Sequence, residues 1–99
     1  MLAFRGELDI SNAHWAEAEL KRAEQALSDG SRLVLDLRAL EFIDSTGLRF
    51  ILSARARALE AGRRLLVVRG PEPVERVFRV TRADSMLEMF DDPAPALAS

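Results

Sequence analysis

The chain has 99 residues, of which 48% are hydrophobic and 30% are charged, and this length suffices for one domain with a modest core. With a formal net charge of −2, the chain lacks the excess of basic residues typical of nucleic-acid binding, and no apolar run is long enough for membrane insertion. The lack of cysteine and the single histidine, His14, exclude disulfides, thiolate metal sites and multi-histidine centres. We therefore expect a cytoplasmic protein that needs no metal or other cofactor.

The first half of the chain alternates between strand and helix patterns. Leu2–Ile10 has apolar residues at alternating positions, which predicts a strand at a sheet edge. Ser11 and Asn12 then offer side chains that can cap a helix. Apolar residues at helical spacing follow at Ala16, Leu20, Ala23 and Leu27. We expect this helix to end at Ser28–Gly30, and the nearly continuous apolar run Leu33–Leu37 predicts a strand buried on both faces.

The second half continues the alternation. After a polar loop at Asp44–Gly47, an apolar stripe predicts a helix. The members of this stripe are Leu48, Ile51, Leu52, Ala56 and Leu59. A strand is predicted at Arg64–Arg69, a helix from Pro73 onward, and a helical turn with a short strand at Glu88–Phe90. Residues 91–99 are expected to form a tail. This order of elements predicts an α/β fold with a largely parallel sheet.

The loop Asp44-Ser45-Thr46-Gly47 is the most informative segment, because it follows the most buried strand and opens a helix. In open α/β sheets, sites gather at the carboxyl ends of the strands. A phosphate on a hydroxyl at a helix N-terminus is favoured by the unpaired N–H groups and the helix dipole. The same residues are also ordinary capping residues, and Gly47 can reflect a turn or close packing. On the motif alone both interpretations stay open, and they are compatible.

An enzymatic interpretation rests on Asp36 and Asp44 as a pair of carboxylates. No histidine or third carboxylate is placed to assist them, and no nucleophile–base pair is visible, so we do not expect an enzyme. Asp36 is instead expected to be a buried strand residue that steadies the loop. Phe50 falls on the opposite side of the helical wheel from the apolar stripe, which predicts an exposed aromatic contact.

Four segments, in their order and spacing, resemble the STAS domain family, and most closely its stand-alone bacterial anti-sigma factor antagonists. These segments are Gly6–Asp9, Leu33–Leu37, Phe42–Leu48 and Ala61–Val67. The resemblance implies one STAS domain over residues 1–90 and a tail at 91–99. It also implies a largely parallel mixed sheet of four to five strands, with helices mainly on one side. Two features depart from the family pattern: its first strand is short or absent, and Thr81-Arg82-Ala83 stands where Thr-Gly-Leu is usual.

The resemblance also implies a regulatory protein controlled by phosphorylation. In the family, the unphosphorylated antagonist binds an anti-sigma factor that is also a serine kinase, and a sigma factor is freed for transcription. The kinase phosphorylates a loop residue that falls on Ser45 here, with Thr46 as the second choice, and a serine phosphatase reverses the modification. Supporting acidic residues fall on Asp9 and Asp36. The residues expected to bind the partner are Asp44, Ser45, Thr46, Gly47, Arg49 and Phe50.

A second interpretation keeps the fold and changes the role. Single STAS domains also serve as subunits of lipid-transport ABC complexes and as parts of stress-sensing assemblies, where the loop serves docking alone. In either role we expect protein partners, no nucleic acid, no membrane insertion, and a monomer or weak dimer.

Overall fold

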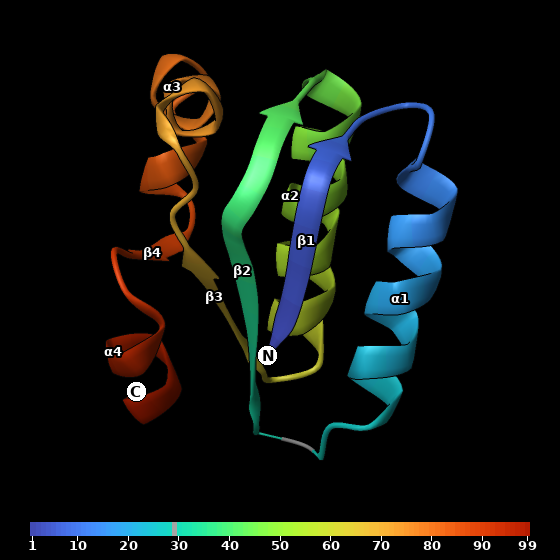
Figure 1. Ribbon diagram of the computed structural model, residues 1–99. Helices are drawn as coiled ribbons and strands as arrows, with labels where there is room; N and C mark the ends of the chain where they lie inside the picture. Colours follow the sequence, from blue (N-terminus) through green and yellow to red (C-terminus); the bar gives the residue numbers. More distant parts are fainter. Residues whose placement is uncertain (29) are drawn as a thin grey trace.

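Four parallel strands in the order β1-β2-β3-β4 form the centre of the molecule (Figure 1). The computed structural model describes residues 1–28 and 30–99. The strands are β1 (Leu2–Leu8), β2 (Arg32–Ile43), β3 (Arg64–Val68) and β4 (Glu88–Phe90). The predicted α/β fold and its largely parallel sheet are confirmed, with four strands. Between the described strands every pairing is parallel, so the antiparallel component of a mixed sheet is not found there.

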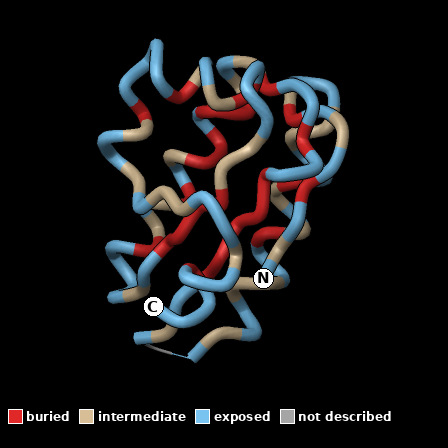
Figure 2. The backbone as a smooth tube through the Cα atoms, turned by 60° about the vertical axis from the view of Figure 1, so that its left-hand side comes forward, coloured by how far each residue is buried: buried red, intermediate tan, exposed pale blue. Residues whose placement is uncertain are grey.

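Helices cover both faces of this sheet, but unequally. The helices are α1 (Ala13–Gln25), α2 (Ser45–Glu60), α3 (Glu72–Val80) and α4 (Pro93–Ala98), with a short 3₁₀ turn at Ala83–Ser85. The larger core lies between one sheet face and α1, α2 and α3, whereas α4 covers a smaller cluster on the other face. Figure 2 shows the buried residues gathered at the centre of the domain. The expectation that helices pack mainly on one side is confirmed.

The alternation of side chains along β2 explains the two cores. Leu33, Leu35 and Leu37 belong to the larger cluster, and Val34 belongs to the smaller one. Because successive strand residues point to opposite faces, a strand covered on both sides needs apolar residues at successive positions. The central, doubly buried strand predicted from this apolar run is therefore confirmed.

The strand β2 runs six residues further than the apolar run predicted, to Ile43. This extension pairs with β1, placing Glu7 opposite Phe42 and Leu8 opposite Ile43. Register shifts in β1, one of them beside Gly6 with its φ of 68°, break the two-residue alternation that marks a strand in sequence. The consequence is that β1 and β2 end side by side at the carboxyl edge of the sheet.

The buried face of α2 differs from the predicted stripe. Leu48 and Ile51 are buried as expected, but Ala56 and Leu59 are exposed. The predicted exposure of Phe50 is wrong: its side chain is only 9% exposed, and its ring lies 5.9 Å from that of Phe4, edge to face. The physical reason is that α2 packs against both the sheet and the neighbouring α1, so its buried arc is wider than one stripe.

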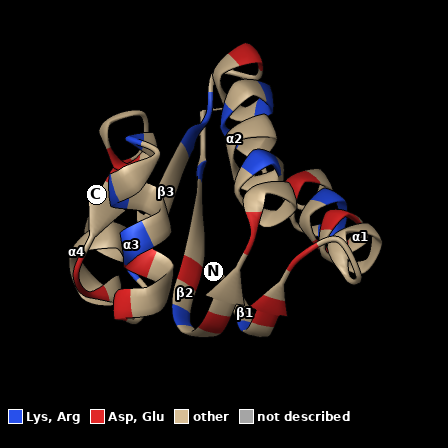
Figure 3. Ribbon diagram, turned by 90° about the horizontal axis from the view of Figure 1, so that it is seen from above, with Lys and Arg blue, Asp and Glu red and all other residues tan. Residues whose placement is uncertain are grey.

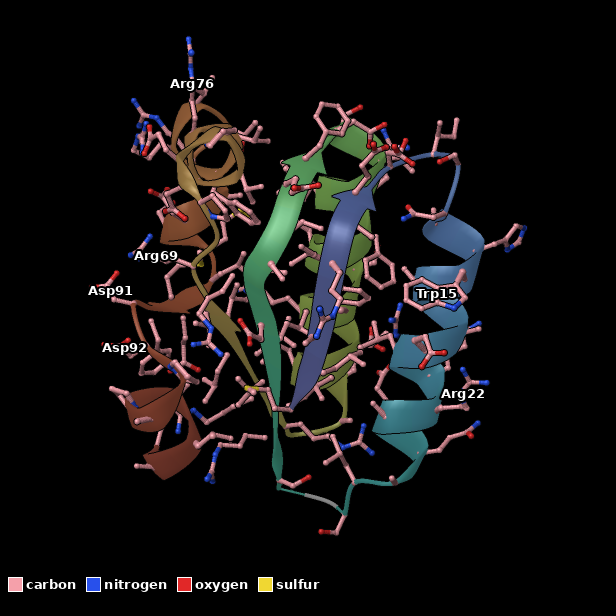
Figure 4. The ribbon with its side chains drawn as sticks, in the orientation of Figure 1. Trp15, Arg22, Arg69, Arg76, Asp91 and Asp92 are labelled. Atoms are coloured by element: carbon pink, nitrogen blue, oxygen red, sulfur yellow. The ribbon has the colours of Figure 1, made fainter. Side chains whose placement is uncertain are left out.

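Residues 91–99, expected to form a tail, contain α4, which contacts β2, β3 and β4. Its Ala96 is fully buried, and the Arg69 guanidinium on the preceding β3–α3 loop pairs with Asp91 at 3.1 Å, both labelled in Figure 4. The turn expected at Ser28–Gly30 includes Asp29, which lies outside the described residues.

The departure at Thr81-Arg82-Ala83 has a clear backbone consequence. Arg82 has a φ of 62°, in the left-handed region that glycine adopts without steric cost and that strains a residue with a side chain. Ala83 beside it is buried, so the packing after α3 is kept while the backbone at Arg82 carries the strain.

Candidate functional site

Asp44 joins the two loops at the carboxyl edge of the sheet and starts α2. Its side chain accepts a hydrogen bond from the Gly47 N–H at 2.9 Å, which is a helix N-cap, and its carbonyl accepts from the Leu48 N–H at 3.0 Å. Its other carboxylate oxygen lies 3.4 Å from the Ile10 N–H in the β1–α1 loop, and its own N–H donates to the Leu8 carbonyl at 3.3 Å. The Asp44 carboxylate is thus committed to structure.

Ser45 is the first residue of α2, and its side chain is exposed. No side-chain hydrogen bond joins its hydroxyl to any other residue within 1–28 and 30–99. Thr46 is half-buried and lines a shallow groove of about 190 Å³ between α1 and α2, with Arg49 and Phe50. Of the two candidate acceptors, Ser45 is therefore the more accessible.

Gly47 holds the start of α2 against the ends of β1 and β2. A Cβ added at this position would collide with the Leu8 carbonyl oxygen and would lie 2.8 Å from Cγ1 of Ile43. Where two backbones approach this closely, only glycine fits without displacing a neighbouring atom. The close-packing interpretation of Gly47 is confirmed, and its role at this site is to position the Ser45 backbone.

Acidic residues lie at the ends of β1 and β2, where Figure 3 draws red segments. Asp9 accepts hydrogen bonds from the Ser11 N–H at 2.9 Å and the Ser11 hydroxyl at 2.5 Å, and the hydroxyl bond is the main cause that lowers the pKa of Asp9. The pKa of Glu7 is raised, chiefly by a hydrogen bond with Asp9 and then by repulsion from Asp9 and Glu41. These carboxylates lack cation partners within the described ranges, so this edge carries uncompensated negative charge.

Two exposed apolar side chains flank the acidic residues. Ile10, in the β1–α1 loop, is 78% exposed, and Phe42, near the end of β2, is 50% exposed. Neither exposed position is predicted from the sequence. Ile10 falls within the predicted strand, and the irregular register between β1 and β2, which turns Phe42 outward, leaves no pattern in the sequence. Exposed apolar residues that lie close together are typical of a contact surface. Ile10, Asp44, Ser45, Phe42 and Arg49 together define what we call the serine surface.

Asp36 is not brought to this site. It is buried, and its carboxylate accepts from Nε and Nη2 of Arg38 at 3.0 and 2.9 Å and from the Arg38 N–H at 3.0 Å. These hydrogen bonds from Arg38 lower the pKa of Asp36. From Asp36 to Asp44 the chain spans up to roughly 26 Å at the usual strand rise of about 3.3 Å per residue. The expectation that Asp36 steadies the loop is corrected, whereas Asp9 does lie beside the loop. The separation also removes the carboxylate pair on which an enzymatic interpretation rested.

The fold and the site define a small α/β domain that presents the exposed Ser45 at the carboxyl edge of a parallel sheet. The chain belongs to the STAS domain family, whose model matches residues 1–96, and the family predicted from the sequence is thereby confirmed. No helix in the described ranges is long and apolar enough to cross a membrane.

Solved structures of similar fold support this assignment. One is the crystal structure of an anti-sigma factor antagonist from Mycobacterium paratuberculosis, 23% identical with a TM-score of 0.79, covering 97% of this chain and 80% of that one. Another is a proposed anti-sigma factor antagonist from Thermotoga maritima, 27% identical with a TM-score of 0.76, covering 95% of this chain and 80% of that one. No curated protein matches the chain.

Proposed function

We propose that this chain is an anti-sigma factor antagonist, a binding protein and not an enzyme. In its unphosphorylated form it binds an anti-sigma factor in the cytoplasm, and a sigma factor is freed for transcription. Membership of the STAS family and the likeness to two structures described as such antagonists support this role. The observation that carries the proposal is the exposed Ser45 hydroxyl at the first position of α2, within a surface that is both apolar and acidic.

Phosphorylation of Ser45 is the proposed switch. The anti-sigma factor, acting as a serine kinase, transfers the γ-phosphoryl group of ATP to Ser45 Oγ, while the hydroxyl proton leaves and ADP is released. A serine phosphatase adds water across the new bond and restores the hydroxyl. The N-terminus of α2 tolerates the added charge of about −1.5 to −2, so the fold survives. At the docking surface, the phosphate adds bulk and a charge that must be desolvated against the apolar contacts of the partner, and Asp44 beside it repels that charge, so the phosphorylated chain is released.

The partner surface is expected to be basic and apolar. Ile10 and Phe42 offer apolar contacts, and the unpaired carboxylates around them favour cations on the partner. Thr46 and Arg49 extend the contact into the groove between α1 and α2. Phe50 lies at the base of this groove and acts through packing, because its side chain is buried.

Affinity capture from the source cell tests this role. We expect the wild-type chain and Ser45→Ala to capture an anti-sigma factor with a kinase domain, and Ser45→Asp to lose it. Ser28→Asp, which adds the same charge at an exposed position near the end of α1, should capture it normally. Capture of lipid-transport ABC subunits in place of an anti-sigma factor would support the alternative role and overturn this one.

Incubation of the captured kinase with ATP and the purified chain tests the acceptor residue. Mass spectrometry should map one added phosphate to Ser45 in the wild-type chain and none in Ser45→Ala. Ser53→Ala is the matched control, because Ser53 is also an exposed serine of α2 and its loss should leave the modification intact. A phosphate mapped to Thr46 would move the switch to the second candidate.

A further inference from the structure

A second hollow lies at the opposite end of α2 from Ser45. It has a volume of about 140 Å³ and lies between the last turns of α2, the start of β3 and the segment that leads into β4. Three arginines line it, Arg55, Arg63 and Arg64, together with one acid, Glu88. At 1.5 Å per residue, the α2 residues that line this hollow, Arg55 to Leu59, lie about 15 to 21 Å along the helix from Ser45. It is therefore a separate candidate site, which we call the arginine pocket.

The charges of the arginine pocket are unbalanced. Glu88 accepts two hydrogen bonds from Arg64, at 3.1 Å from Nε and 2.5 Å from Nη2, so this acid is already paired. Arg55 and Arg63 make no ion pair within the part of the chain that the structure describes. The pocket thus keeps two guanidinium groups whose charge no described carboxylate offsets.

Arg63 also has an orphaned donor. Its Nε is buried and has no hydrogen-bond acceptor among the described residues. The nearby helix end does not supply one, because the carbonyls of Arg57, Ala58 and Leu59 already accept from the N–H groups of residues 61–63. A buried donor without a partner is costly, and in native proteins it commonly marks a missing ion, water or ligand.

The remaining lining of the pocket is apolar. Leu65 and Ala58 are buried, Leu87 is half-buried, and Leu59 and Met86 are 61% and 48% exposed at the rim. Inorganic anions gain nothing from such a surface, whereas an apolar group does. The volume corresponds to about five water molecules at their liquid density, which suits a short carbon chain.

We propose that the arginine pocket binds a small carboxylate with a short apolar chain. The carboxylate accepts hydrogen bonds from the guanidinium groups of Arg55 and Arg63, and the chain lies against Leu65, Leu87 and Met86. Arginine suits this task because its planar donors match a carboxylate in pairs.

Titration of the purified chain with hexanoate, followed by NMR, tests the proposal without any partner protein. We expect saturable shifts of the Arg63 Nε–H signal and of the amides of residues 86–88, with a dissociation constant on the order of 1 mM for a ligand of this size. Hexanamide, which has no charge, and inorganic phosphate, which has no apolar chain, should each bind at least about tenfold more weakly. Equal binding of hexanamide or of phosphate, or no saturable shift with hexanoate, would overturn the proposal.

Two single variants locate the site. Arg55→Gln and Arg63→Gln should each weaken hexanoate binding about tenfold, since each removes a charged donor. Arg76→Gln is the matched control, because Arg76 projects from α3 away from the pocket (Figure 4) and its loss should leave the affinity unchanged. Equal weakening by all three variants would show that general charge attraction is responsible, and would also overturn the site. Neither result bears on Ser45, because no phosphorylation is measured.

Discussion

The two ends of α2 differ in how their polar groups are satisfied. At the start, Asp44 accepts a hydrogen bond from the Gly47 N–H and another from the Ile10 N–H of the β1–α1 loop, so these bonds hold the loop and leave Ser45 exposed. At the end, the backbone is equally well capped, but the Arg63 side chain keeps a buried donor without a partner. A helix end whose polar groups are hydrogen-bonded holds a modifiable side chain in a fixed position. An end with an orphaned buried donor is suited to hold a ligand.

The largest expected effect tests whether packing against α1 and β1 holds the start of α2. Phe50→Ala removes an edge-to-face contact with Phe4 and leaves a cavity, so the free energy of unfolding should fall by about 4 kcal/mol. Leu59→Ala is the matched change at the other end, where the side chain is exposed, and should cost less than about 0.5 kcal/mol. Chemical denaturation measures both. Similar losses in the free energy of unfolding for the two variants would support the apolar stripe predicted from the sequence, in which Leu59 is buried.

A second pair of variants compares the glycines near the two ends. Gly47→Ala should cost about 3 kcal/mol, because the new Cβ meets the Leu8 carbonyl and Ile43. Gly62→Ala should cost only about 1 kcal/mol, because its φ of 68° strains alanine although no atom lies within 4 Å of the new Cβ. The same denaturation experiment decides the order. If Gly62→Ala is the more damaging, close packing does not hold the loop.

Partner binding should depend on the serine surface and not on the arginine pocket. Phe42→Ala should weaken binding of the captured anti-sigma factor on the order of 30-fold, as loss of a contact residue at an interface does. Met86→Ala, a comparably exposed apolar residue at the rim of the arginine pocket, should leave the affinity unchanged. Calorimetric titration measures both affinities. A loss with Met86→Ala alone would place the partner at the wrong end of α2 for this proposal.

The smallest effect concerns Asp36, which lies in β2 between the two ends. Because Arg38 lowers the pKa of Asp36 in the folded state, the pair stabilises the fold above the unfolded pKa, about 3.9. That contribution is lost as the pH falls through the lower folded pKa. Asp36→Asn should therefore cost about 1 kcal/mol at neutral pH, discounted for the exposed Arg38.

Unfolding of wild type and Asp36→Asn across pH 2 to 7 measures this difference, which should shrink only below about pH 3.9. A constant difference down to pH 2 would mean that the Asp36 carboxylate is not stabilised by Arg38.

Local patterns predicted the elements whose neighbours in sequence define them. The Asp44 cap on the Gly47 N–H joins residues three apart, so it follows from spacing, whereas the contacts of Asp44 with Ile10 and of Gly47 with Leu8 depend on the fold. The apolar run Leu33–Leu37 likewise marks a doubly covered strand by itself. The order of strands and helices was readable for the same reason, since short crossover connections leave parallel pairing as the simple solution.

Other features depended on which elements meet in space. Phe50 is buried because it packs against Phe4 of β1 where α1 and α2 meet, and Phe42 is exposed because register shifts between β1 and β2 turn it outward. Asp36 lies far from Asp44 because β2 continues past the apolar run, and α4 became part of the domain by covering Val34, Leu66 and Val68.

The sequence by itself determined the family, the α/β order and the loop that presents Ser45, because each depends on residues that are close along the chain. The tertiary structure alone decided which side chains surround that serine and where a second, arginine-lined pocket lies. Both depend on contacts between α2 and distant elements, and such contacts leave no periodic signal in the sequence of any one of them.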